Sequence, residues 1–154
     1  MSAAITLEHI EAKQSEIQKL IERFKAEQPR ALHLSATPIE LAQGEVYAGI
    51  VLADDGALSH HLVLLPGEVE YVSWTNAQDW AEDQGGQLPT RREQALLFAN
   101  CKQHFQAAAY WSGQQHETDS GWAWYQYFSH GSQTCLGKSI EVRARAVRRL
   151  PIGE

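Results

Sequence analysis

The chain has 154 residues and a net charge of −6, and 44% of its residues are hydrophobic. This length allows one domain with a core and one additional element, and the apolar content excludes an intrinsically disordered chain. The negative charge disfavours nonspecific binding to a nucleic-acid backbone, and no run approaches the roughly 18 apolar residues of a membrane-spanning helix. The N-terminal stretch MSAAITLEHIEAKQ lacks a basic region followed by an apolar core. We therefore expect no signal peptide, and a location in a cytoplasm or in a particle assembled there.

Residues 5–28 predict one amphipathic helix, which Pro29 ends. Its apolar stripe consists of Leu7, Ile10, Ile17, Leu20, Ile21 and Phe24, in which Ile10, Ile17 and Phe24 recur every seven residues. This spacing is typical of a short coiled coil. The helix either associates with other copies or folds back on the domain, and we predict a homo-oligomer held through residues 5–28. The expected organisation is an N-terminal helix at 1–29 and a domain at 30–154.

The next part of the chain predicts strands. LHLSATPIEL, residues 32–41, alternates weakly and predicts an edge strand bent at Pro38. A hairpin follows, with strands at Val46–Ala53 and Ser59–Leu65 joined by a tight turn at residues 54–56. His60 and His61 are adjacent on this hairpin and fall on opposite faces of a regular strand, so we expect no shared metal ion there.

Two helices are predicted after the hairpin. Ser73 is placed to cap the first, whose apolar face carries Trp74, Ala77, Trp80 and Ala81 and which ends at Gly85 and Gly86. Thr90 and Glu93 form a capping box for the second, whose apolar faces carry Ala95, Leu96, Phe98 and Ala99. Residues 121–129 and 139–149 predict further strands. This order of elements indicates an α+β domain with a mostly antiparallel sheet.

Few residues indicate catalysis. The sequence contains no phosphate-binding glycine loop, no G-x-S-x-G, no H-E-x-x-H and no C-x-x-C. Cys101 and His104 lie one helical turn apart, which suits half a metal site, a nucleophile with its base, or a buried thiol beside an exposed imidazole. His116, Glu117 and Asp119 suit either a cation site or a solvated loop.

The stretch YWSGQQHETDSGWAWYQYFSHGSQ, residues 110–133, holds three of the five Trp and three of the five Tyr. In a strand, one side carries Trp122, Trp124, Gln126 and Phe128, and the other carries Ala123, Tyr125 and Tyr127. We predict that Trp124 and Phe128 lie in the core. Tyr125 and Tyr127 are then free to form a contact surface, because Tyr among small and amide residues is the composition of binding loops. A plain sheet with amphipathic tyrosines is the alternative.

Four motifs occur in order: LPTRREQALLFA, YWSG, GWAWYQYFSHG and VRARAVRRL. They resemble a bacterial and phage domain family of unknown function with the pattern L-P-T-x-x-E, Y-W-S-[SG], A-W-x-x-x-F-x-x-G and R-x-R-A-V-R. This family includes the C-terminal domain of a bacterial collagen-like adhesin. It is similar to the C-type-lectin fold of retroelement-diversified receptor-binding proteins and formylglycine-generating enzymes. The resemblance covers about residues 44–150, and it implies a C-type-lectin-like domain with two helices. The hairpin GEVYAGIVL…HHLVLLPGE further resembles the phage-encoded members, in which this hairpin precedes the motifs.

The resemblance also implies roles for individual residues. Those on the pattern are structural: Trp111, Trp124, Phe128, Gly131, Arg145 and Arg148. Those at positions that vary in the diversified relatives form a surface for a ligand or partner: Gln115, His116, Thr118, Tyr125, Tyr127, His130, Ser132, Gln133 and Lys138. Formylglycine-generating relatives bind copper through cysteines, but Cys101 and Cys135 lie in no comparable motif, and the calcium motifs E-P-N and W-N-D do not occur. We expect no metal site and no cofactor.

These inferences favour a phage or prophage binding module that is not an enzyme and that binds a host protein or a surface glycan. It is expected in the bacterial cytoplasm or on a phage particle, without membrane or direct nucleic-acid partners. The alternative is an intracellular inhibitor or regulator of a host protein machine, such as a defence complex, because an acidic protein can occupy a basic site.

Overall fold

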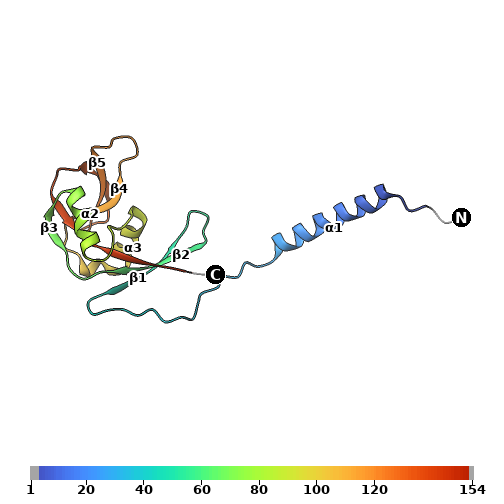
Figure 1. Ribbon diagram of the computed structural model, residues 1–154, viewed down its shortest axis with the longest axis horizontal. Coiled ribbons are helices and arrows are strands. Elements are labelled where there is room, and N and C mark those ends of the chain that lie inside the picture. The colour runs from blue at the N-terminus through green and yellow to red at the C-terminus, as the bar shows by residue number, and fades with distance from the viewer. Residues whose placement is uncertain (1–3, 153–154) are drawn as a thin grey trace. The chain divides into compact units, whose positions relative to one another are not determined.

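A computed structural model describes residues 4–152. Within this range the chain is α+β, with three α-helices, one short 3-10 helix and eight strands in two mostly antiparallel sheets (Figure 1). It divides into two compact units, with the boundary after Ala36. No helix in residues 4–152 is both long enough and apolar enough to cross a membrane.

The first unit contains α1 (Leu7–Glu27), which begins after Thr6, whose hydroxyl accepts the His9 N–H at 3.3 Å. None of the side chains of α1 is buried. The predicted edge strand at 32–41 is wrong, because these residues form neither helix nor strand. Leu32 and Leu34 are 67% and 56% exposed, so their alternation has no sheet face to cover.

The smaller sheet consists of β1 (Val46–Leu52), β2 (Leu58–Leu64) and β8 (Val147–Pro151), in the order β1-β2-β8. It confirms the predicted hairpin, whose turn is closed by the Ala53 N–H donating to the Ala57 carbonyl at 2.8 Å. Gly56 in this turn has a φ of +85°, which favours glycine. This sheet brings the first and last strands of the second unit together on either side of β2.

The larger sheet has the order β3-β7-β4-β5-β6. Its strands are β3 (Val69–Val72), β4 (Ala109–Gln115), β5 (Trp122–Tyr127), β6 (Gln133–Gly137) and β7 (Val142–Ala144), and β4 pairs with β7 in parallel. The prediction of one strand at 139–149 is wrong, because the chain leaves this sheet after Ala144 and enters the smaller one at Val147. The crossing is fixed by Arg145, whose Nη2 donates to the Leu65 carbonyl at 2.8 Å, and by Ala146, whose carbonyl accepts the Leu65 N–H at 3.0 Å.

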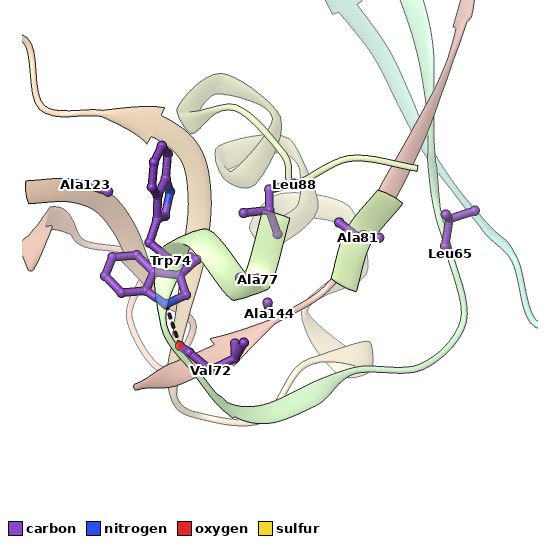
Figure 2. Close-up of a cluster of buried hydrophobic side chains, with 10 residues drawn as sticks. Leu65, Val72, Trp74, Ala77, Ala81, Leu88, Ala123 and Ala144 are labelled. Carbon is purple, nitrogen blue, oxygen red and sulfur yellow. Dashed lines mark hydrogen bonds between the residues drawn. The ribbon is translucent and has the colours of Figure 1, made fainter. Parts of the chain in front are cut away.

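Helix α2 (Trp74–Asp83) covers one core cluster. Trp74, Ala77 and Ala81 face inward, as predicted, and Figure 2 shows them beside Leu88 and Ala144. A hydrogen bond from the Trp111 indole to the Val72 carbonyl, 2.9 Å long, ties β4 to the end of β3 in the same cluster. The core here combines the small residues Ala77 and Ala81 of α2 with the large indoles of Trp74 and Trp111.

Helix α3 (Arg91–Cys101) covers the second cluster and is followed by the 3-10 helix η1 (Lys102–His104). The predicted Thr90–Glu93 capping box is present, but the predicted apolar faces are not the buried side of α3. The buried residues are Glu93, Gln94, Leu97 and Cys101, whereas Ala95 and Ala99 are exposed and Leu96 and Phe98 are half-buried. A prediction from apolar residues alone misses the buried side of α3, because Glu93 and Gln94 on this side are polar and make hydrogen bonds within the core. The Gln94 amide, for example, donates to the Tyr110 carbonyl at 3.0 Å.

Candidate functional site

The two faces of β5 are covered by different helices. Ala123 is fully buried and Tyr125 packs beside it against the α2 cluster. The prediction that Trp124 points into the core and Tyr125 away from it is therefore wrong: Trp124 and Tyr125 are half-buried, and only Tyr125 packs against a core cluster. Phe128 follows the last residue of β5, is 1% exposed and lies in the α3 cluster, so its predicted core position is confirmed.

Cover by α3 decreases along the face of β5 that carries Gln126, Trp124 and Trp122. Gln126 is 1% exposed, and its amide donates to the Gln94 carbonyl of α3 at 3.0 Å. Trp124 lies under the side chain of Arg91, the first residue of α3, whereas Trp122 is 44% exposed. The start of α3 therefore decides which aromatic residues of β5 remain accessible.

Arg91 lies flat on Trp124, with its guanidinium carbon 3.4 Å from the ring centroid. Such a cation–π contact contributes about 0.5–2 kcal/mol, depending on its desolvation. The ring of His116 is nearly parallel to that of Trp124, at 8° and 6.3 Å between centroids. The indole N–H of Trp124 donates to Glu117 Oε1 at 3.0 Å. We call Trp122, Trp124, Arg91 and His116 the aromatic face.

Neighbouring amides hold Arg91 in place. Its Nε donates to Gln133 Oε1 at 3.1 Å, and the Gln133 amide nitrogen donates back to the Arg91 carbonyl at 2.7 Å. The same nitrogen lies 2.8 Å from Gln126 Oε1, which it also reaches as a donor. The Arg91 N–H donates to Gln114 Oε1 at 2.7 Å. The Trp124 ring is thus ordered before any partner binds.

Hydrogen bonding also fixes the charge of Glu117 beside this face. A hydrogen bond from its own backbone N–H is the main cause that lowers the pKa of Glu117, with further help from the Trp124 indole and the charge of Arg91. The carboxylate therefore stays ionised at neutral pH and adds a negative rim to the aromatic face.

The predicted binding residues fall into two groups and one outlier. One group lies at the Trp122 end of β5 or under Arg91: Gln115, His116, Thr118, Gln133 and Lys138. The other lies at the β5–β6 turn: Tyr127, His130 and Ser132, with the Tyr127 and His130 rings stacked at 5.2 Å. Tyr125 belongs to neither group. Within residues 4–152, no side-chain hydrogen bond or ring contact joins the two groups.

The first group is itself well ordered. Lys138 Nζ donates to Gln115 Oε1 at 2.6 Å and lies 4.5 Å from the ring centroid of Trp74. His116 Nδ1 accepts the backbone N–H groups of Thr118 and Asp119 at 3.2 and 3.0 Å. A nitrogen that accepts two N–H bonds carries no proton of its own, so His116 presents its Nε2 edge to the surroundings.

Sequence reasoning missed Arg91, Gln114 and Trp122 as surface residues. The capping box signals that Arg91 is the first residue of α3, and hence that its side chain lies outside the helix interior. Nothing in the sequence indicates that this side chain reaches Trp124, thirty-three positions along the chain.

A groove continues from the aromatic face toward the β1–β2 turn. Its volume is about 790 Å³. The lining residues are Val51, Leu52, Ala53, Asp54, Ser59, His60, Thr90, Arg91, Arg92, Ala95, Gln114 and Gln133. Because Arg91 belongs to both features, a ligand on the aromatic face can extend into this groove.

A hydrogen-bonded line of Ser59, His60 and Glu93 borders the groove. Ser59 Oγ lies 2.8 Å from His60 Nδ1, and His60 Nε2 lies 2.7 Å from Glu93 Oε2. Glu93 also accepts two bonds of 2.7 Å from Arg149 and one of 2.8 Å from the Thr90 N–H. Burial alone would raise the pKa of Glu93, but the bonds and charge of Arg149 outweigh it and hold the pKa below its usual value. Glu93 is thus saturated with donors and joins α3 to both β2 and β8.

The other residues singled out for chemistry do not assemble into a reactive site. Cys101 is fully buried, and burial raises the pKa of its thiol, which disfavours the reactive thiolate. His104 is exposed in η1, whereas Cys101 ends the buried side of α3. Within residues 4–152 no group of three His, Cys, Asp or Glu side chains is placed to hold a metal ion.

Comparison with known proteins does not assign the chain to a family. The chain matches no protein-family model and no curated protein. Proposals about its function therefore depend on the aromatic face and on the sequence motifs.

Proposed function

We propose that this chain is a phage-encoded, non-enzymatic binding module that uses the aromatic face to bind a host protein or a surface glycan. The observation that carries the proposal is the pair of indoles on one face of β5, with Trp122 44% exposed and Trp124 held under Arg91. A Trp side chain offers 150–250 Å² of contact area, so two of them side by side supply the centre of an interface.

The order of the face favours binding. Docking of a partner on Trp124 costs this chain little side-chain entropy. Glu117 already holds the indole, and Gln133 already holds Arg91, which covers the ring. Exposed Gln114 beside the face offers an amide donor that suits a peptide carbonyl or a sugar hydroxyl. Both partner classes named above therefore fit the same chemistry.

Sequence motifs support a C-type-lectin-like fold for residues 37–152. The L-P-T-x-x-E motif coincides with the capping box of α3, and the Trp111 and Phe128 positions of the pattern are both buried. Arg145 and Arg148 of the last motif bond to the Leu65 carbonyl and to Glu45. These positions support the resemblance, whereas Trp124, to which the pattern also gives a structural role, lies under Arg91 in the aromatic face.

An inhibitor of a host protein machine is the second candidate. The ionised Glu117 and the exposed Asp119 border the aromatic face, which favours a partner with a basic surface. Mass spectrometry of purified phage particles separates the two candidates: a virion component is found there, and an intracellular inhibitor is not.

The test compares Trp122→Ala with Tyr71→Ala, an equally drastic change at an exposed residue of β3. Wild-type and variant chains are applied to a glycan array and to host lysate, and captured proteins are identified by mass spectrometry. We expect Trp122→Ala to weaken the selected interaction at least about 30-fold, as the loss of an aromatic anchor does, and Tyr71→Ala to leave it unchanged. Equal binding by both variants would refute the aromatic face as the binding surface.

A further inference from the structure

Helix α1 exposes a continuous apolar seam. Leu7, Ile10, Ile17, Leu20, Ile21 and Phe24 are between 40% and 69% exposed. No side chain of α1 is buried. Polar pairs such as Arg23–Glu27, at 3.0 Å, lie within the helix and leave the seam uncovered. Apolar side chains in a row along a helix of 21 residues are unfavourable in water unless another apolar surface packs against them.

The seam follows the heptad repeat of a coiled coil. With Leu7, Gln14 and Ile21 at position a, position d is filled by Ile10, Ile17 and Phe24. The alternating spacing of three and four residues runs through the whole helix, and Gln14 is its one polar member. Only a partner with the same repeat covers such a seam evenly, and a second copy of α1 has it.

Gln14 selects the orientation of the copies. In a parallel, in-register bundle, Gln14 meets Gln14 of its neighbours, and the amides can bond to one another. In the antiparallel alignment that buries all the apolar seam residues, Gln14 faces Ile17 of the other copy and its amide has no partner. A buried amide without a partner is costly, so the parallel arrangement is favoured.

Other positions agree with this orientation and favour more than two copies. In the parallel arrangement Lys13 lies beside Gln18 of the next copy, and Leu20 lies against the aliphatic stem of Lys25, so no like charges meet. Ile10 and Ile17 occupy position d, where a β-branched side chain disfavours two-stranded packing and shifts the preference to larger bundles. We propose that α1 assembles the chain into a parallel, in-register homotrimer.

One consequence rests on the proposed function. Parallel helices end side by side, so three copies of the domain that follows begin at one end of the bundle. Binding of the first domain then raises the effective concentration of the other two at a repetitive surface. The trimer itself does not depend on that function, because its test measures mass and proximity alone.

The first test is the mass of the full chain by light scattering and sedimentation equilibrium over a wide range of protein concentrations. We expect about three times the 17.3 kDa of one chain. Ile17→Lys places a charge in the seam and should give the monomer mass, whereas Ser15→Lys adds the same charge outside the seam and should keep the trimer. Thermal unfolding of the second unit should be the same in both variants. A monomeric or dimeric full chain overturns the proposal.

Orientation is tested by disulfide formation. Gln14→Cys and Ser15→Cys are made in a Cys135→Ser background, since Cys101 is buried. Mild oxidation should crosslink the Gln14→Cys chain quickly, because equivalent residues meet in a parallel bundle, and the Ser15→Cys chain slowly. Equal rates, or a trimer mass without crosslinking at Gln14→Cys, would show that the copies are not parallel and in register.

Discussion

Glu93→Ala is expected to destabilise the domain by about 3 kcal/mol. The side chain is fully buried and accepts bonds from His60, Thr90 and twice from Arg149. Removal of one partner of a buried ion pair costs roughly 3–5 kcal/mol, because the other charge is left uncompensated. Here the Arg149 side chain is 27% exposed and its Nη2 still reaches the Leu88 carbonyl at 3.2 Å, so the low end of that range applies.

Urea denaturation followed by tryptophan fluorescence measures this loss. The control is Asp54→Ala, which removes another Arg–carboxylate pair, Arg92–Asp54 at 2.6 Å, whose acid is 96% exposed. Exposed pairs contribute about 0–1 kcal/mol, so the control should change stability little. If Glu93→Ala costs no more than Asp54→Ala, then the buried carboxylate does not hold α3 on the smaller sheet as we argue.

Stability should also depend on pH through Glu93. Its pKa in the folded chain is held below the value of about 4.3 in an unfolded chain. The stability contributed by its charge is therefore fully present above the unfolded value and is lost as the pH falls through the folded value. An acid titration of the free energy of unfolding should be shallower in Glu93→Ala than in the wild type.

The remaining predictions concern aromatic residues. Phe128→Ala should cost about 3–5 kcal/mol in urea denaturation, because the ring is 1% exposed, whereas Trp124→Ala should cost clearly less, since its ring lies at the surface under Arg91. The reverse order would show that Trp124 is the core residue. Burial raises the pKa of Tyr110 to about 12, and the carboxylate of Glu68 adds to this rise. An absorbance titration should therefore detect one tyrosine that ionises near this pH and is lost in Tyr110→Phe. Because the folded pKa lies above the unfolded value of about 10, the stability that Tyr110 contributes declines as the pH rises between these values. A titration in which Tyr110→Phe removes no late-ionising group contradicts the burial of this hydroxyl.

Local sequence signals were sufficient to predict the elements whose first or last residues carry a recognisable cap or turn. Gly56 marks the hairpin turn, Gly85 with a φ of +84° ends α2, and Thr90 with Glu93 begins α3. Each of these signals acts through backbone geometry or a hydrogen bond within a few residues of its origin. The helices and the hairpin were therefore predictable in position.

Burial on the larger sheet was not predictable in the same way. The alternation of β5 defines two faces but does not say which is covered, and both carry aromatic residues. The outcome is decided by α2 on the Ala123 side and by α3 on the Gln126 side, which are non-local contacts. The size of the indole favoured Trp124 for the core, whereas the buried residue is the small Ala123, in the same cluster as Trp74 of α2.

The capping box at the start of α3 also determines where the side chain of Arg91 lies. Because Thr90 and Glu93 fix the first turn, Arg91 is the first helical residue and projects over Trp124. Three residues further along α3, the Gln94 carbonyl accepts the Gln126 amide, so the first turns of the helix cover β5 from Gln126 to Trp124. Glu93 thus stabilises the contact of α3 with the smaller sheet and, through the helix start that it fixes, positions Arg91 over Trp124 in the aromatic face.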